Sequence, residues 1–202
     1  MNFLKGAVYL SLAASIWGIT YVVSKVILET ISPWLLLELR FILALLTLGI
    51  ICYFQKSWKI NKKDLLPIAI IALIGYTGSI GLQFVGTKLS GAAMGSLITS
   101  ASPALISFFA FLILKEKINN RKILSLLLAT AGVIVVIGLP NGNTDFGAYY
   151  GNIILVGAAI TWALYTVLSK VQTNKYSSLT VTTWATVFGV IFTLPFTIIE
   201  QS

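Results

Sequence analysis

The sequence predicts an all-α integral membrane protein. Of its 202 residues, 57% are hydrophobic and only 10% are charged, and its mean hydropathy is +0.94. Soluble domains carry about 25% charged residues, so this chain has too little polar surface to face water on all sides. Its apolar residues also form continuous runs of the length that a helix needs to cross a bilayer, about 20 residues.

Seven apolar runs are long enough to be transmembrane helices. They are continuous and do not alternate as the strands of a membrane β-barrel do. The first run continues past Trp17 to Val23, which is longer than the apolar core of a signal peptide, so we interpret it as a retained helix. The predicted helices are 6–24, 33–54, 65–85, 92–114, 123–139, 152–168 and 179–199.

The basic residues between the runs predict the orientation of the chain. Eleven of the 14 Lys and Arg residues lie on one side of the membrane, whereas Lys25 and Lys88 lie on the other and Arg40 lies inside a run. Because basic loops stay in the cytoplasm, we expect a multi-pass protein of the cell membrane with a cytoplasmic N-terminus. This topology explains the net charge of +8 without nucleic acid as a partner.

The composition excludes several kinds of site. The chain has no histidine and one cysteine, Cys52, which excludes an internal disulfide, a Cys/His zinc site and histidine-based acid–base catalysis. We therefore expect no enzyme activity, no metal and no cofactor. A seven-helix receptor would place its N-terminus outside, and a retinal protein would need a lysine in run 179–199, which has none.

Two distant segments resemble each other. Residues 10–26 align without gaps with residues 155–171, and eight positions are identical, among them Trp17 with Trp162. Chance is the alternative, because apolar helices draw on few residue types. The copies are five helices apart, and an odd number turns the second copy upside down in the membrane. We therefore predict an inverted repeat, the arrangement that surrounds the central site of many alternating-access transporters.

Several short features follow one another along the chain. They are Ala14, Trp17 and Lys25 in the first run, Pro33 and Arg40-Phe41 in the second, AAMGSLITSASP (Ala92–Pro103) and LKEK (Leu114–Lys117) in and after the fourth, and Ala131-Gly132-Val133 in the fifth. In this order and spacing they resemble the EamA-like family of the drug/metabolite transporter superfamily. The resemblance implies ten helices in two inverted five-helix repeats, and export of metabolites such as amino acids, or of drugs.

By this resemblance, residues 1–140 form the first repeat with five helices, and residues 149–202 begin a second, incomplete repeat with two. We expect a secondary transporter for the efflux of small organic solutes by alternating access. Its expected partners are the solute, membrane lipid and either a second copy of the chain, as a homodimer, or missing C-terminal helices. The alternative is a non-transporting fragment or a membrane assembly subunit.

Polar and aromatic residues inside the runs are the candidates for a solute site, because polar groups in a bilayer are costly and tend to face a wet cavity. The fourth run has a stripe of hydroxyl residues and Pro103, which frees a backbone carbonyl one turn earlier and favours a kink. Close helix packing is the alternative for its small residues. Gln83 is expected to meet water at the outer end of its helix. The predicted solute-binding residues are Trp17, Tyr21, Tyr76, Thr99, Ser100 and Trp162.

Three charged residues are candidates for gating or structural roles. Glu38 and Arg40 are two positions apart, so they do not face each other on a helix. Arg40 either snorkels or pairs with another helix, or else contacts an anion, and Glu38 is a candidate proton-coupling carboxylate. Glu116, between two lysines at the end of the fourth run, is expected to fix the helix end or to gate the inner mouth.

Overall fold

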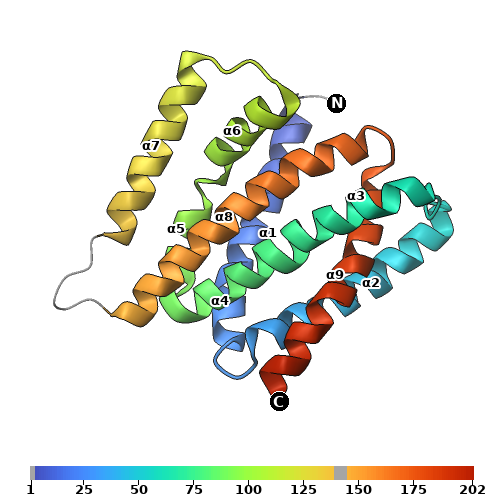
Figure 1. Cartoon of the computed structure of the whole chain (residues 1–202), viewed down its shortest axis with the longest axis horizontal. Coiled ribbons are helices and arrows are strands. Elements are labelled where there is room, and N and C mark those ends of the chain that lie inside the picture. Colours follow the sequence, from blue (N-terminus) through green and yellow to red (C-terminus); the bar gives the residue numbers. More distant parts are fainter. Residues whose placement is uncertain (1–2, 139–144) are drawn as a thin grey trace.

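The computed structural model describes residues 3–138 and 145–202, and its regular structure in these ranges is helical throughout. Seven spans there are long and apolar enough to cross a membrane, which confirms the predicted helices (Figure 1). Residue 139, where the fifth was expected to end, lies outside the described residues. The spans are α1 (Phe3–Ile27), α2 (Pro33–Gln55), the third span of α3 (Lys62–Ala72), η1 (Leu73–Ile80) and α4 (Gly81–Ser90), the fourth span of α5 (Ala92–Thr99) and α6 (Ser102–Leu114), α7 (Asn120–Ile137), α8 (Phe146–Thr173) and α9 (Ser178–Gln201).

Local sequence signals set the ends of these helices. Asn119, Asp145 and Ser177 precede α7, α8 and α9, and each side chain accepts a hydrogen bond from a free N–H group of the first turn. Helices α2 and α6 end at Lys56 and Lys115, whose φ angles of 52° and 54° turn the chain out of the helix. Their positive charges also suit the negative end of the helix dipole.

Helix α8 is central in the bundle (Figure 1). It packs against the third and fourth spans, while α9 packs against α2 and α3. Helix α1 packs mainly on α4 and α5, and α7 on α5 and α6. The core therefore lies between α8, the third span, α2 and α9, and the first and fifth spans lie at its edge.

Small residues allow α4 and α8 to approach closely. A Cβ atom at Gly86 would lie 2.7 Å from Cγ of Leu155, and one at Gly151 would lie 2.7 Å from Cβ of Leu89. Real side chains do not pack at such distances, so only glycine fits at both positions. Close approach through glycine is a common means of holding membrane helices together, because lipid provides no hydrophobic drive between them.

The α2–α9 contact is lined by threonines of α9. Thr183 Oγ1 lies 3.1 Å from Sγ of Cys52, and Thr197 Oγ1 donates to the carbonyl oxygen of Trp34 at 3.2 Å. The Cys52 side chain is fully buried. Hydroxyl groups of α9 thus find hydrogen-bond partners on α2 away from water, which ties the two helices together.

Two spans are interrupted inside the bundle. The fourth span breaks between Thr99 and Ser102, as Pro103 predicts, and Ser102 Oγ donates to the Thr99 carbonyl oxygen at 2.6 Å. The third span contains the wider turns of a π-helix, η1, which the sequence analysis did not predict. Such segments shift the register of the residues that follow them and are frequent at functional sites.

Candidate functional site

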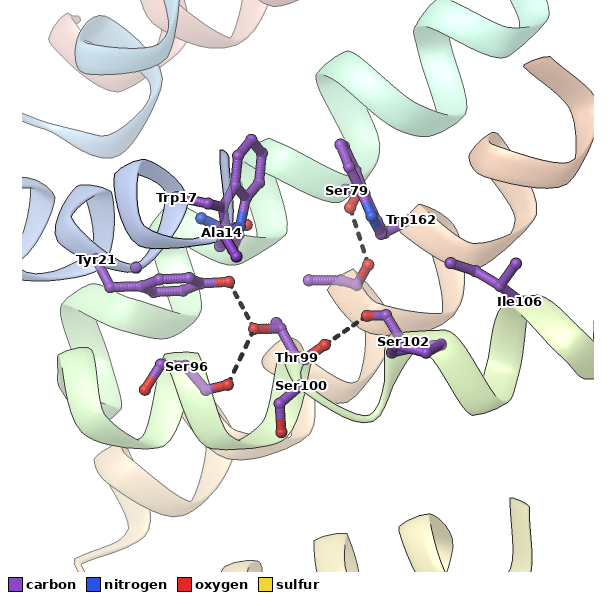
Figure 2. A pocket seen from close by; sticks show the side chains of 14 residues that line it. Ala14, Trp17, Tyr21, Ser79, Ser96, Thr99, Ser100, Ser102, Ile106 and Trp162 are labelled. Atoms are coloured by element: carbon purple, nitrogen blue, oxygen red, sulfur yellow. Dashed lines mark hydrogen bonds between the residues drawn. The ribbon is translucent and has the colours of Figure 1, made fainter. Parts of the chain in front are cut away.

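The two interruptions border a cavity of about 400 Å³. Helix α1, the third and fourth spans, and α8 all contribute to its wall (Figure 2). Its size falls within the range of small-molecule sites, about 300–1,000 Å³. The lining residues are Ala14, Trp17, Gly18, Tyr21, Ser79, Gln83, Ser96, Thr99, Ser100, Ser102, Pro103, Ile106, Ala158 and Trp162.

An aromatic pair forms one part of the wall. The rings of Trp17 and Trp162 have centroids 5.2 Å apart and planes tilted by 38°. These two residues occupy the same position in the aligned segments of α1 and α8. The two aligned segments therefore meet at the cavity through their matching tryptophans.

Hydroxyl groups form another part (Figure 2). Thr99 Oγ1 donates to the Gly95 carbonyl oxygen at 2.7 Å, so the Tyr21 hydroxyl, 2.6 Å away, donates to Thr99. Ser96 and Ser100 also donate to backbone carbonyl groups, at 2.9 and 2.6 Å. A hydroxyl has one hydrogen and two lone pairs, so these oxygens present acceptor positions to whatever enters the cavity.

The cavity wall carries no formal charge within the described residues, because no Asp, Glu, Lys or Arg is among its lining residues. Gln83 supplies an amide group, which can both donate and accept hydrogen bonds. The cavity thus combines the electron-rich faces of aromatic rings with hydrogen-bond acceptors.

Five of the six predicted solute-binding residues line the cavity: Trp17, Tyr21, Thr99, Ser100 and Trp162. The sixth, Tyr76, does not belong to the lining. Its ring packs between Phe41, 5.4 Å away, and Tyr165, 5.7 Å away. The extra residue per turn in η1 accounts for this, since it moves Tyr76 off the face that Ser79 and Gln83 share.

Gln83 was expected to meet water at the outer end of its helix, and that expectation is wrong. Its side chain is 5% exposed and lines the cavity. Ser102 also lines the cavity and was not among the predicted residues. Its position directly before Pro103 was the available signal, since a serine there can bond to the carbonyl group that proline leaves free.

Glu116 lies away from the cavity, where α6, α7 and α8 come together. Its carboxylate is 2.8 Å from Lys170 Nζ and 3.8 Å from Lys122 Nζ. The hydrogen bond from Lys170 holds the pKa of the Glu116 carboxyl below its usual value. A second, smaller cavity of about 160 Å³ lies beside this cluster, and Ile106 lines both cavities.

Glu38 and Arg40 also lie outside the cavity lining. Glu38 is buried in the α2–α9 contact, where it meets the hydroxyl of Thr193. The guanidinium of Arg40 lies over the ring of Phe84, 5.1 Å from its centroid. Within the described residues, neither side chain takes part in an ion pair. Arg40 is therefore held by an aromatic ring on α4 rather than by a carboxylate.

Comparison with known proteins identifies the family. The EamA-like transporter family matches residues 4–138 and 149–202, which is nearly the whole chain. The chain belongs to the EamA-like transporter family. It is accordingly a multi-pass membrane protein of a transporter family, and the resemblance stated from the sequence is confirmed.

Relatives in this family carry transporter names. The chain is 32% identical over 201 residues to the uncharacterized transporter YetK of Bacillus subtilis, covering 96% of this chain and 61% of that protein. It is 27% identical to YoaV of the same organism, covering 93% and 64%. It is 24% identical to the S-adenosylmethionine/S-adenosylhomocysteine transporter of Chlamydia muridarum, covering 85% and 55%. The chain thus spans about three fifths of the length of these relatives. No solved structure matches it.

Proposed function

We propose that this chain provides the solute site of a secondary transporter that exports small organic solutes by alternating access. The observation that carries the proposal is the meeting of Trp17 and Trp162, matching residues of two similar segments, at the wall of one cavity. The two separate family matches support a repeat of two units, 4–138 and 149–202. Helices α1 and α8 run in opposite directions in Figure 1, which supports an inverted one.

We propose that the preferred solutes are organic cations that also carry an aromatic or apolar group. Aromatic faces attract cations, by about 2 kcal/mol when water is excluded. The acceptor oxygens of Ser96 and Ser100 add to this preference, and an anion would find no cationic side chain in the lining. One relative is named as a transporter of S-adenosylmethionine and S-adenosylhomocysteine, and both of these molecules combine an ammonium group with an aromatic base.

A pair of matched ligands tests the solute class. Phenethylammonium and 3-phenylpropanoate both have a phenyl ring on a short chain and differ in the sign of their charge. We expect the purified protein in detergent to bind radiolabelled phenethylammonium, and to bind the carboxylate at least tenfold more weakly. Equal or tighter binding of the carboxylate would contradict the proposal.

Substitution of the tryptophan pair tests the site. Trp17→Leu and Trp162→Leu should each weaken phenethylammonium binding by about tenfold, because leucine keeps an apolar surface but loses the cation–π attraction, and tenfold corresponds to about 1.4 kcal/mol. The control is Trp184→Leu, since Trp184 packs on Trp58 outside the lining. If the melting temperature of the Trp17 variant falls together with its affinity, Trp17 is a packing residue and the proposed site is contradicted.

We further propose that Glu116 and Lys170 close the cytoplasmic end of the path. Ile106 lies between the central cavity and the smaller cavity, and the ion pair lies beside the latter. A solute leaving the central cavity in that direction would pass Ile106 and then the ion pair. In the expected orientation this end faces the cytoplasm.

A further inference from the structure

Glu38 is the one acidic side chain that is buried within the described residues, with 5% of its surface exposed. It is the sixth residue of α2, about 8 Å along the helix axis from Pro33. A carboxylate at such a depth is costly when ionised and tends to have a functional reason. The other acidic residues lie in loops or near helix ends: Glu29, Asp64, Glu116, Asp145 and Glu200.

The hydroxyl group of Thr193 can hydrogen-bond to Glu38 in either protonation state of the carboxyl group. Thr193 Oγ1 contacts Oε2 of Glu38 and lies 2.8 Å from the carbonyl oxygen of Gly189. The hydroxyl has only one hydrogen, so it cannot donate fully to both oxygens. When Glu38 carries a proton, its O–H group donates to Thr193, and Thr193 donates to Gly189. When Glu38 is ionised, it accepts the hydrogen of Thr193, and the bond to Gly189 is given up.

The charged groups around Glu38 leave it without an ion-pair partner in the described chain. On α2, Arg40 is turned to the ring of Phe84 on α4. On α9, Glu200 accepts from the Trp34 N–H group at 3.0 Å, near the end of the helix. Helix α4 carries Lys88 in its last turn, and η1 contributes the neutral ring of Tyr76. A proton is therefore the available means of neutralising the Glu38 carboxylate.

A row of aromatic rings joins this carboxylate to the cavity. An added Cβ at Gly189 would lie 3.2 Å from the ring of Phe41 and 3.4 Å from Cβ of Tyr76, so Gly189 packs against both residues. The ring of Tyr76 contacts Tyr165, whose centroid is 5.0 Å from that of Trp162 in the cavity wall. A change in the bond between Thr193 and Gly189 thus acts on the residue against which Phe41 and Tyr76 pack.

We propose that Glu38 is a proton-binding site whose protonation is coupled to occupancy of the cavity. This inference rests on the proposed transport function and names the coupling ion for it. A hydronium ion transfers its proton to the carboxylate oxygen, which forms the neutral acid and leaves a water molecule; the other changes are in hydrogen bonds alone. The exchange of the Thr193 hydrogen between Glu38 and Gly189 changes the α2–α9 contact, and the ring row transmits this change to Trp162.

Infrared pH-difference spectra test the proton site without any ligand. We expect the protein in lipid vesicles to show a carbonyl band of a protonated carboxylic acid, which Glu38→Gln removes and Glu200→Gln retains. Glu200 is the matched control because it lies at the same helix contact but is exposed. Thr193→Val should keep the band and shift its frequency, since the acid loses its hydrogen-bond partner. A band unaffected by Glu38→Gln, or no such band in the unmodified protein, would overturn the proton site.

Ligand-linked proton exchange tests the coupling. Phenethylammonium added to the protein in weakly buffered solution should release or take up protons, as measured with a pH indicator dye. Glu38→Gln should bind the ligand without this exchange, and Glu200→Gln should behave as the unmodified protein. Binding without proton exchange in the unmodified protein would overturn the coupling and leave the solute site intact. Failure to bind the cation would overturn the proposed function and the coupling with it, whereas the infrared band would still decide the proton site.

Discussion

Helices α1 and α8 have similar sequences and different surroundings. Both carry a tryptophan at the same position and end in the same Ser-Lys-Val sequence. However, 39% of the residues in an apolar 18-residue stretch of α8 are buried, and only 6% of those in such a stretch of α1. Helix α8 is enclosed by the third and fourth spans, whereas α1 packs on α4 and α5 along one side. The sequence of such a helix determines which face turns toward the cavity, and its neighbours determine how much of the rest is covered.

The lysines that end the two segments show the same contrast. Lys25 Nζ donates to the carbonyl oxygen of Lys88 at 2.9 Å, and Lys170 Nζ pairs with Glu116 at 2.8 Å. Both reach from the end of one span to the end of another. One contact is to a neutral carbonyl group and the other to a carboxylate, so only the second depends on the ionisation of its partner.

The largest expected effect concerns the sides of the membrane on which the two segments end. If the repeat is inverted, cysteines introduced at Thr30, after α1, and Asn174, after α8, lie on opposite sides. In right-side-out vesicles an impermeant thiol reagent should label Thr30→Cys and leave Asn174→Cys unlabelled. Both positions are exposed, and buried Cys52 provides little background. Equal labelling of both variants would remove the inverted repeat.

The difference in packing predicts unequal tolerance of a methyl group. Gly151→Ala in α8 should lower the free energy of unfolding by about 1–3 kcal/mol, because the new Cβ overlaps Leu89 and Ser90. Gly18→Ala in α1 meets no atom within 4 Å, and should be neutral or stabilising by up to about 1 kcal/mol through helix propensity. Thermal unfolding in the same detergent measures both. A destabilised Gly18 variant would contradict this difference in packing between α1 and α8.

A smaller, pH-dependent effect should distinguish the two lysines. Hydrogen bonding to Lys170 lowers the pKa of Glu116 in the folded protein, so the ion pair contributes fully above the ordinary carboxyl pKa, about 4.3, and is lost as the pH falls through the lower folded value. Spin labels on cysteines introduced at Lys117 and Thr173 should move apart over that acidic range. Lys170→Met should show the wide distance at every pH.

The matched control for this effect is Lys25→Met, which removes a bond to a neutral carbonyl group on the other side of the bundle. We expect it to leave the distance between the two labels and its pH dependence unchanged. In the labelled protein with the ion pair intact, high salt should increase the distance between the two labels, because exposed charges are screened. A distance that ignores pH, salt and Lys170→Met would show that the ion pair does not hold this end closed.

The sequence predicted the spans well because length and apolar composition dominate membrane insertion. Pro103 also marked the break in the fourth span, since the absence of its N–H group acts locally. The π-helix η1 was not predicted. No local motif marks its wide turns, which place Tyr76 in the ring row and Gln83 in the cavity.

Contacts between residues far apart in the chain could not be predicted from the sequence either. Glu38 was a candidate coupling carboxylate from its depth alone, but its contact with Thr193, 155 positions away, follows only from the way α9 packs on α2. Glu116 was expected at a gate or a helix end, and its partner on α8 could not be read from the neighbouring lysines. Whether these residues act in transport remains a prediction.

The burial of Cys52 allows thiol labelling to measure local opening of the α2–α9 contact. Its thiol is fully enclosed and 3.1 Å from Thr183, so a reagent in solution reacts only during moments when the two helices separate. Under conditions in which the helices reclose faster than the thiol reacts, the labelling rate gives the fraction of time spent open, and hence the free energy of local opening. The single native thiol therefore reports the stability of the α2–α9 contact at its Cys52–Thr183 end, with no substitution in the chain.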